Sequence, residues 1–191
     1  MSEMMEIRWH GRGGQGSKTA SVLLAKMAAA VNKYVQAFPE YGPERMGAPV
    51  LAYTRIDENP IHHHCHIEFP DIVVVLDPTL IEVVDVTQNL KEEGKLLVNT
   101  EQSPEYIKDK LEYGKNINIY SIDADRISEE EIGRIFPNTP MLGALNKVSN
   151  IIKKEKFIDQ ARKEFEKKFK NNQEIIDGNV NAVDRAYQEV K

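Results

Sequence analysis

The chain has 191 residues, of which 41% are hydrophobic and 29% are charged, and its formal net charge is -5. This length is enough for one substantial core and excludes an elaborate multidomain enzyme. The negative charge disfavours nucleic acid and anionic membrane surfaces as partners, because the long-range field repels both.

Cysteine usage limits the redox chemistry that the chain can carry. Cys65 is the single cysteine, so an internal disulfide is excluded. An iron-sulfur cluster normally needs about four thiolates, and any electron carrier must therefore lie on another chain. The N-terminal segment lacks the cationic start and apolar core of a signal peptide, which predicts a cytoplasmic protein without a membrane span.

Short apolar runs alternate with helical patterns along the chain. The run IVVVL is apolar at every position, as in a central strand that is covered on both faces. A nearly all-apolar helix is expected over residues 17–31. The pattern predicts an α/β fold, a Rossmann-like open sheet that is mostly parallel and flanked by helices, with strands at residues 6–10, 34–38, 49–56, 72–77, 95–99 and 117–122.

The composition changes after residue 150, and two units are expected, an α/β domain over 1–150 and a helical extension over 151–191 that packs on it. Phe157, Ala161, Phe165 and Phe169 share one helix face. On the same helix, the acid-before-base spacing predicts ion pairs between Asp159 and Lys163, Glu164 and Lys168, and Glu166 and Lys170.

The glycine loop GRGGQG lies between the first strand and the first helix and matches two templates. Gly11, Gly13 and Gly16 fit the dinucleotide fingerprint, but Gln36 stands where the second strand should carry an acid. The loop also approaches a Walker A motif, with Asp77 as a magnesium-binding candidate. The extra Ser17 turns Lys18 by about 100° around the helix, away from a bound phosphate. A strand end before a helix that starts at Pro78 is the preferred interpretation of Asp77.

Four of the five histidines lie in the run HHHCH at residues 62–66. On a strand, His62, His64 and His66 would share one face, which could hold a metal. The preferred interpretation is a polar strand near solvent without a functional metal, bounded by Pro60 and Pro70.

The loop after the second strand is shaped by Pro39, Pro43 and Pro49, while Gly42 and Gly47 permit a close approach. It presents Glu44, Arg45 and Met46 at its tip. Because loops at the carboxyl ends of a sheet share one crevice, the tip is expected beside the glycine loop, as half of a docking surface.

Four segments in order, GRGGQG, VQAFPEYGPERMGAPVLAYTRI, PDIVVVLDPTL and NTPMLGAL, closely resemble the gamma subunits of the pyruvate:ferredoxin oxidoreductases in the 2-oxoacid:acceptor oxidoreductase family. The resemblance implies a complex in which alpha, beta and delta subunits carry thiamine diphosphate and iron-sulfur clusters. That complex converts pyruvate, coenzyme A and oxidised ferredoxin to acetyl-CoA, CO2 and reduced ferredoxin. This chain would be inactive alone and bind neither the thiamine cofactor nor the clusters.

The resemblance also implies two site loops, at which the chain would contribute to assembly and to the enclosure of coenzyme A. Their residues are Gly13, Gly14, Gln15 and Gly16 in the glycine loop, and Pro43, Glu44, Arg45 and Gly47 in the second loop. Backbone N–H groups at the helix start favour an anion such as a coenzyme A phosphate. The alternative is that the glycines only permit tight packing against another subunit.

Two other functions stay open at this stage. A relative that acts on branched-chain 2-oxoacids would look the same, since another subunit would choose the substrate. A free-standing nucleotide-binding α/β domain is the alternative outside the family, and Gln36 and Ser17 count against it.

Overall fold

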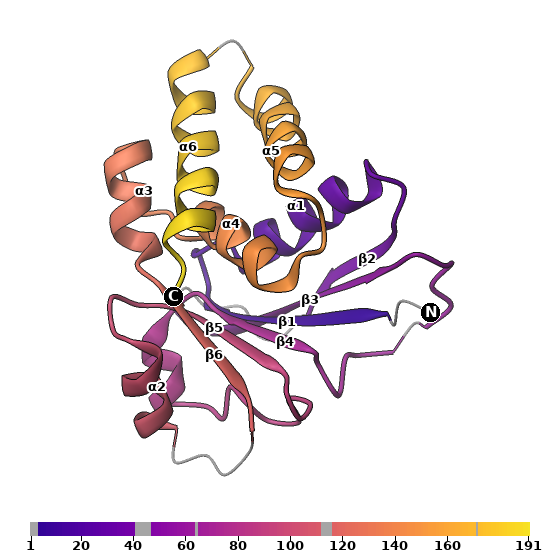
Figure 1. Ribbon diagram of the computed structural model, residues 1–191, viewed down its shortest axis with the longest axis vertical. Helices are drawn as coiled ribbons and strands as arrows, with labels where there is room; N and C mark the ends of the chain where they lie inside the picture. The colour runs from indigo at the N-terminus through magenta and orange to yellow at the C-terminus, as the bar shows by residue number, and fades with distance from the viewer. Residues whose placement is uncertain (1–3, 41–46, 64, 112–115, 171) are drawn as a thin grey trace.

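The computed structural model describes residues 4–40, 47–63, 65–111, 116–170 and 172–191, which form one open sheet with helices on both faces (Figure 1). The strand order is β2-β3-β1-β4-β5-β6. The strands are β1 (Met5–Arg12), β2 (Tyr34–Pro39), β3 (Pro49–Asp57), β4 (Ile72–Val75), β5 (Lys95–Asn99) and β6 (Asn118–Ile122). All six predicted strands are confirmed, within a few residues at their ends.

The sheet is mostly parallel, as predicted. β1, β4, β5 and β6 pair in parallel, whereas β3 is antiparallel to both of its neighbours, β1 and β2. Because β3 lies between β1 and β2, the carboxyl end of β2 is about 10 Å from β1, two strand spacings instead of one. The arrangement therefore departs from a dinucleotide-binding sheet, in which the second strand adjoins the first.

Helices cover the two faces unequally (Figure 1). Within the described residues, one face carries five helices, and the other carries one helix and the 3-10 helix η1. The first set is α1 (Ser17–Ala29), α3 (Ala124–Ile132), α4 (Asn138–Ser149), α5 (Lys154–Phe169) and α6 (Gln173–Glu189); the second is η1 (Pro78–Glu82) and α2 (Pro104–Lys110).

The larger core lies between the sheet and the five helices. Trp9 and Leu24 are fully buried there, and the Trp9 indole donates a 3.0 Å hydrogen bond to the Thr54 hydroxyl. Phe157 and Phe165 of α5 belong to the same core, so the predicted apolar face of this helix packs on its own chain. Helices on both sides of residue 150 share this core, and the division of the chain at that position stays a proposal.

The other face of β1 and β3 is polar although it is buried. Arg55 is 1% exposed and donates to the carboxylate of Glu6 at 2.8 Å. Arg8 donates to His10 Nε2 at 3.1 Å. Burial and the neighbouring Arg8 charge lower the pKa of His10 to about 3, so its imidazole is neutral in the folded protein at neutral pH.

The predicted strand at residues 62–66 is wrong for the residues that the structure describes. His62, His63, Cys65 and His66 are exposed and outside regular structure, and His64 lies outside the described residues. Its last residue, His66, contacts β3: Arg55 Nη2 donates to the His66 carbonyl oxygen at 3.2 Å, and the His66 and Tyr53 rings meet edge to face with their centroids 6.0 Å apart. A side-chain donor thus replaces a strand partner, which the local sequence does not reveal.

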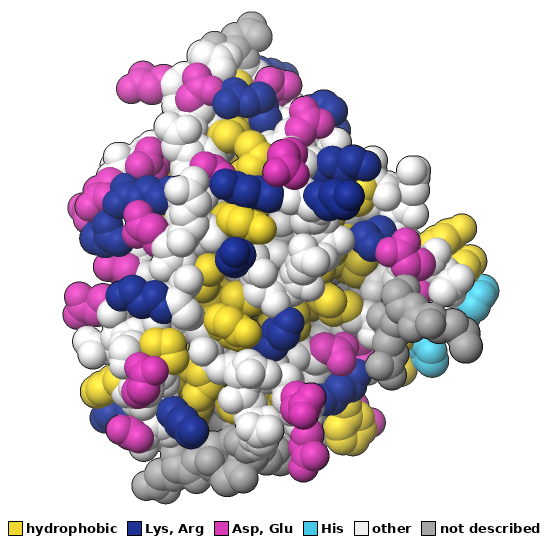
Figure 2. Space-filling view, viewed as in Figure 1, with side chains coloured by type: hydrophobic (Ala, Val, Ile, Leu, Met, Phe, Trp, Pro, Cys, Tyr) yellow, Lys and Arg dark blue, Asp and Glu magenta, His cyan; other side chains and the backbone are white. Residues whose placement is uncertain are grey.

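The helical surface carries mixed charges with hydrophobic side chains between them (Figure 2). Among the described residues, none of the helices has the length and apolarity that crossing a bilayer requires.

Candidate functional site at the carboxyl edge of the sheet

The glycine loop turns directly from β1 into α1. Gly14 and Gly16 have φ values of 99° and 83°, in the left-handed region that side chains with a Cβ disfavour. Gly16 is the N-cap of α1, and its carbonyl oxygen accepts from Ala20 N at 2.9 Å. The loop itself is closed by a bond from Gln15 N to the Arg12 carbonyl oxygen at 3.0 Å. The two glycines are therefore required by the turn.

Arg12 joins three loops that are far apart in the sequence. Its Nε donates to Asp77 Oδ2 at 3.0 Å, its Nη1 to the Gly47 carbonyl oxygen at 3.0 Å, and its Nη2 to Thr79 Oγ1 at 2.8 Å. These partners lie after β4 and before β3, whereas Arg12 ends β1. One guanidinium thus fixes the relative positions of all three loops at this edge.

Asp77 is the acidic partner of Arg12 in this set of contacts. Its side chain also accepts from Gln15 Nε2 at 2.7 Å and caps η1 by accepting from Thr79 N. Burial alone would raise the pKa of Asp77, but the hydrogen bonds from Thr79 and Gln15, together with the Arg12 charge, lower it below its ordinary value. The preferred interpretation of Asp77, a strand end before a helical turn with Pro78 at its start, is confirmed.

The second loop reaches the glycine loop at its described end. Gly13 N donates to the Ala48 carbonyl oxygen at 3.0 Å, and Gly47 N donates to the Gly13 carbonyl oxygen at 3.4 Å. Pro43, Glu44 and Arg45 lie outside the described residues. The structure thus brings together Gly13 and Gly47, and the position of the loop tip stays a prediction.

A hollow of about 350 Å³, here called the glycine-loop hollow, lies between the carboxyl ends of β1 and β4. This is the point from which the chain winds in opposite directions, where open α/β sheets bind ligands. The hollow is lined by Gly14, Gln15, Leu76, Asp77, Pro78, Thr79, Asp125, Ile135, Phe136 and Pro137.

Asp125 gives the glycine-loop hollow an acidic wall. Burial raises the pKa of Asp125, and the negative charges of Asp123 and Asp77 add to the rise, although a hydrogen bond from Asn99 opposes it. Asn99 is 3% exposed and binds both Asp125 Oδ1, at 3.1 Å, and the Leu76 carbonyl oxygen, at 2.9 Å. The wall is therefore fixed, and it disfavours a phosphate inside the hollow.

Asn138 supports the glycine loop from the helical side. It opens α4 and is 4% exposed. A Cβ at position 16 would lie 2.6 Å from Asn138 Nδ2, so a larger residue there needs the carboxamide to shift and is also disfavoured by the left-handed φ. Among the described residues, Asn138 Oδ1 is a buried side-chain acceptor without a hydrogen-bond partner.

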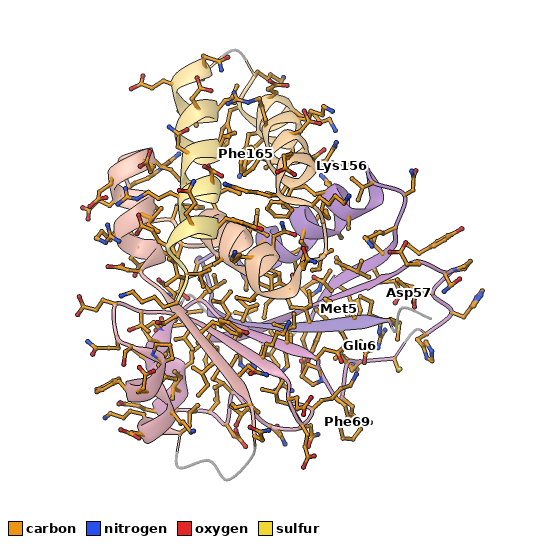
Figure 3. All side chains as sticks on the ribbon, viewed as in Figure 1. Met5, Glu6, Asp57, Phe69, Lys156 and Phe165 are labelled. Carbon is orange, nitrogen blue, oxygen red and sulfur yellow. The ribbon has the colours of Figure 1, made fainter. Side chains whose placement is uncertain are left out.

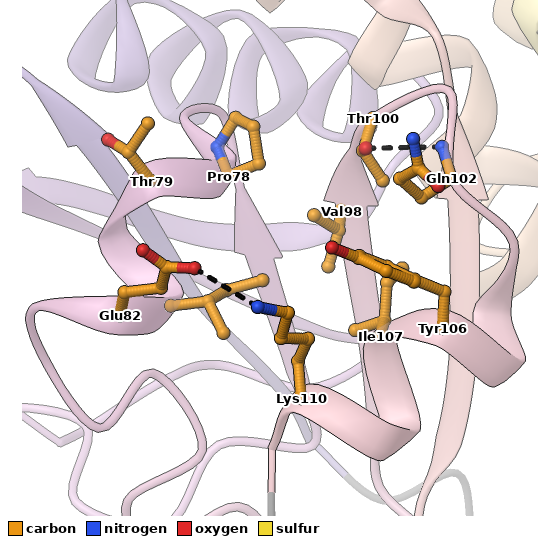
Figure 4. Close-up of a pocket in the computed structure, with 10 residues that line it drawn as sticks. Pro78, Thr79, Glu82, Val98, Thr100, Gln102, Tyr106, Ile107 and Lys110 are labelled. Atoms are coloured by element: carbon orange, nitrogen blue, oxygen red, sulfur yellow. Dashed lines mark hydrogen bonds and ion pairs between the residues drawn. The ribbon is translucent and has the colours of Figure 1, made fainter.

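A second hollow of about 220 Å³ lies on the other side of η1 (Figure 4). Val98, Ile107 and the ring of Tyr106 form apolar walls, and an ion pair of 3.6 Å between Lys110 and Glu82 crosses its rim. It shares Pro78 and Thr79 with the glycine-loop hollow. Its walls bear no charged group besides that pair, and we assign it no chemistry.

The geometry agrees poorly with a dinucleotide or triphosphate site. Gln36, at the position where an acid is needed, lies within β2 and accepts from Arg55 Nη1 at 3.3 Å. Lys18 lines a groove between α1 and α5 and is not among the residues that line the glycine-loop hollow. Neither side chain is placed to contact a nucleotide there.

Sequence reasoning missed Arg12, Asp125 and Asn138. Arg12 was readable as a variable position inside the glycine motif, at the end of a strand that also carries Glu6, Arg8 and His10. Asp125 had no local signal, because it faces Asp77, which is more than 45 residues away along the chain. Asn138 opens the segment NTPMLGAL, but that segment does not reveal its contact with the distant Gly16.

Comparison with known families identifies the chain. The family model described as "Pyruvate ferredoxin/flavodoxin oxidoreductase" matches residues 6–189. The chain belongs to the pyruvate ferredoxin/flavodoxin oxidoreductase family. It is a subunit of a pyruvate:ferredoxin oxidoreductase, a 2-oxoacid oxidoreductase, and the resemblance in the four sequence motifs is confirmed.

Three relatives define its place in the family. The chain is 49% identical to pyruvate synthase subunit PorC of Thermotoga maritima over 97% of this chain and 94% of that protein. The crystal structure of that pyruvate oxidoreductase subunit superposes with a TM-score of 0.84, at 44% identity, over 100% of this chain and 98% of the other.

The second relative is the common gamma subunit of the pyruvate/ketoisovalerate oxidoreductases of Pyrococcus abyssi, 52% identical over 80% of this chain and 82% of that protein. The third, a 2-oxoglutarate:ferredoxin oxidoreductase from Magnetococcus marinus, shares the fold alone. It has a TM-score of 0.78 at 19% identity, and the match covers 98% of this chain but 31% of that longer chain. The relatives at 49% and 52% identity are named as subunits, so this chain acts with other subunits.

Proposed function

We propose that this chain helps to enclose coenzyme A and to hold the oxidoreductase together, without binding thiamine diphosphate or an iron-sulfur cluster itself. The observation that carries the proposal is the Arg12 connection, which fixes three loops around the glycine-loop hollow. Preorganised loops at the carboxyl edge of a sheet are suited to binding a ligand or a neighbouring subunit. The partners proposed are alpha, beta and delta subunits, with ferredoxin as the electron acceptor of the complex.

The donor set supports the cofactor assignment. A cluster needs about four thiolates, and the sequence has one cysteine, Cys65, which is exposed and lies on the far face of β3 from α1. Clusters and the thiamine cofactor therefore belong to other subunits in this proposal. Coenzyme A is the group that we propose for this edge.

The charges of the site indicate how coenzyme A would lie. Asp77 and Asp125 repel phosphate from the glycine-loop hollow, which is better suited to an uncharged, hydrogen-bond-donating part of the molecule. The phosphates fit outside it, at the start of α1 after Gly16, where the helix dipole favours an anion. In this arrangement Arg45 would contact the same phosphates from the second loop.

Substrate selection is assigned to another subunit. The relatives from Pyrococcus abyssi and Pyrococcus furiosus are named as common to pyruvate and ketoisovalerate oxidoreductases, and a shared subunit does not discriminate between those substrates. We propose pyruvate as the substrate of the complex that contains this chain. A complex for branched-chain 2-oxoacids is the second candidate, because those two relatives are named as common to both kinds of oxidoreductase.

The test is Arg45→Ala in the reconstituted complex, measured as viologen reduction beside size-exclusion chromatography. The expected result is either an apparent KM for coenzyme A that rises about tenfold with the KM for pyruvate little changed, or a weakened complex, because a paired arginine contributes about 1–3 kcal/mol. Lys156→Ala, on the exposed side of α5, is the matched control. Unchanged assembly and kinetics would remove Arg45 from the site, and full turnover without this chain would overturn the proposed function.

A further inference from the structure

A groove of about 480 Å³ runs between α1 and α5, on the helical layer. Its apolar lining comes from Val22 and Leu23 of α1 and from Phe165 of α5. Val22 and Leu23 are only partly buried, so aliphatic surface remains open in the groove. Figure 3 labels Phe165 and, about two and a half turns earlier on the same helix, Lys156.

The rim of the groove is strongly basic. Lys18, Lys26, Lys167 and Lys168 line it, and Glu164 is the acidic residue among the lining residues. Glu164 pairs with Lys167 at 2.5 Å and lies 4.0 Å from Lys26, instead of the Lys168 partner that the helix spacing predicts. Lysines thus outnumber the acidic residue among the lining residues, on a chain whose net charge is -5.

The spacing of these charges indicates the shape of their partner. Lys18 and Lys26 are separated by about 12 Å along α1, from a rise of about 1.5 Å per residue. A single phosphate does not span that length. Phe165 is 1% exposed, so among the lining residues no aromatic face is open to stack a nucleotide base. Carboxylates repeated along an elongated apolar element match the groove better.

We propose that this groove docks an acidic amphipathic helix of another subunit of the oxidoreductase. The apolar side of that helix would cover Val22 and Leu23, and its Asp and Glu side chains would face the lysines, as in helix-in-groove recognition. The inference rests on the assembly role in the proposed function, but it concerns a surface separate from the glycine-loop hollow. The partner that this surface selects is therefore an acidic, amphipathic helix.

The first experiment is the double variant Lys167→Glu/Lys168→Glu, co-purified with its partner subunits. We expect the dissociation constant of the complex to rise about tenfold or more, because two attractive contacts become repulsive. The association of the wild type should weaken as salt is added, and that of the variant should respond less. Lys156→Glu makes one charge reversal of the same kind, half the change in net charge, on the same helix outside the groove and should leave association unchanged. Unaltered melting temperatures of the isolated chains would show that both variants fold.

A second measurement does not depend on any variant. A zero-length carboxyl-to-amine cross-linker applied to the assembled wild-type complex should join Lys26, Lys167 or Lys168 to acidic residues spaced three or four apart in one partner segment. Lysines that stay uncross-linked and open to acetylation in the complex would overturn the proposal. So would a double variant that assembles normally but shows a raised KM for coenzyme A, which would indicate a small anionic ligand. If the groove variant disrupts assembly while Arg45→Ala changes nothing, the groove stands and the coenzyme A assignment fails.

Discussion

The two faces of β1 and β3 are both buried, but they are held by different forces. On the side of α1, Ile7 and Trp9 pack into a continuous apolar core. On the opposite side, Arg8 and Arg55 are buried with polar partners. The apolar face tolerates imprecise geometry because dispersion and burial are non-directional, whereas the polar face depends on each hydrogen bond being made. Burial alone therefore does not show which interactions stabilise this sheet.

The largest predicted loss of stability tests the apolar core through Phe157 of α5, one of the C-terminal helices. Phe157 is fully buried, and Phe157→Ala should lower the free energy of unfolding by about 3–5 kcal/mol, from lost burial and a residual cavity. Chemical denaturation monitored by circular dichroism measures it. Phe169→Ala, at the partly buried end of the same helix, should cost much less. A separate early transition for the C-terminal helices, with the main one unmoved, would contradict a shared core.

The polar face should respond to the loss of one charge. Arg55→Met leaves Glu6 without its partner and removes the donor to Gln36 and the His66 carbonyl oxygen. The expected loss is about 2–4 kcal/mol of unfolding free energy, because the largely buried Glu6 carboxylate is left without its partner.

The double variant Arg55→Met/Glu6→Gln sharpens this result. It should recover part of the loss, since the uncompensated charge is gone. Equal losses in the single and double variants would show that packing of the arginine stem, and not its pairing, holds this face.

The pattern of success in sequence prediction follows the same division. The run Ile72–Val75 is apolar throughout, and its central position could be predicted because the signal is local. The position of β3 between β1 and β2 could not, because antiparallel insertion depends on register between distant segments. The segment at 62–66 was misassigned because Arg55, on another strand, supplies its partner.

The candidate site shows the same limit. Gly14 and Gly16 were located because a strand, a glycine turn and a helix follow one another in sequence. The Arg12 to Asp77 pair joins residues 65 apart, and no local pattern announces such a contact. Arg45 was singled out by loop composition, and its role stays a prediction.

The next prediction concerns His10, on the polar face, and the pH dependence of the free energy of unfolding. Because the pKa of His10 is lowered from 6.5 to about 3 in the folded chain, the unfolded chain binds a proton that the folded chain does not between these values. The contribution of His10 to stability is therefore complete above about pH 6.5 and is lost as the pH falls toward about 3. From about pH 7 to about pH 4.5 the loss should be about 2–3 kcal/mol.

His10→Gln, which keeps an acceptor for Arg8 but does not titrate in this range, provides the measurement. Urea unfolding at the two pH values should show a smaller pH dependence for the variant than for the wild type. An equal dependence in both proteins would mean that the imidazole is protonated in the folded state, and that this face is more open to water than its burial indicates.

The smallest predicted difference, about 1 kcal/mol, is between alanine variants of Gly14 and Gly16, where the apolar layer meets the site. Gly14→Ala and Gly16→Ala both place a side chain at positive φ, which costs about 1–2 kcal/mol of unfolding free energy. A Cβ at position 14 meets nothing within 4 Å, whereas one at position 16 would lie 2.6 Å from Asn138 Nδ2. Gly16→Ala should therefore be the more destabilising of the two, by an additional amount of about 1 kcal/mol.

Asn138→Ala decides whether that additional cost comes from the side-chain contact. In a double-mutant cycle, the Gly16→Ala penalty measured by thermal unfolding should fall to that of Gly14→Ala once Asn138 is shortened, because backbone strain remains and the overlap is relieved. Gly14→Ala should show no coupling to Asn138. If Gly16→Ala costs the same with and without the Asn138 side chain, the carboxamide moves aside freely, and Asn138 does not fix the loop. If the extra cost of Gly16→Ala disappears when Asn138 is shortened, Asn138 is the residue that fixes the glycine loop. Through it, α4 and the C-terminal helices that pack on α4 would determine the shape of that loop.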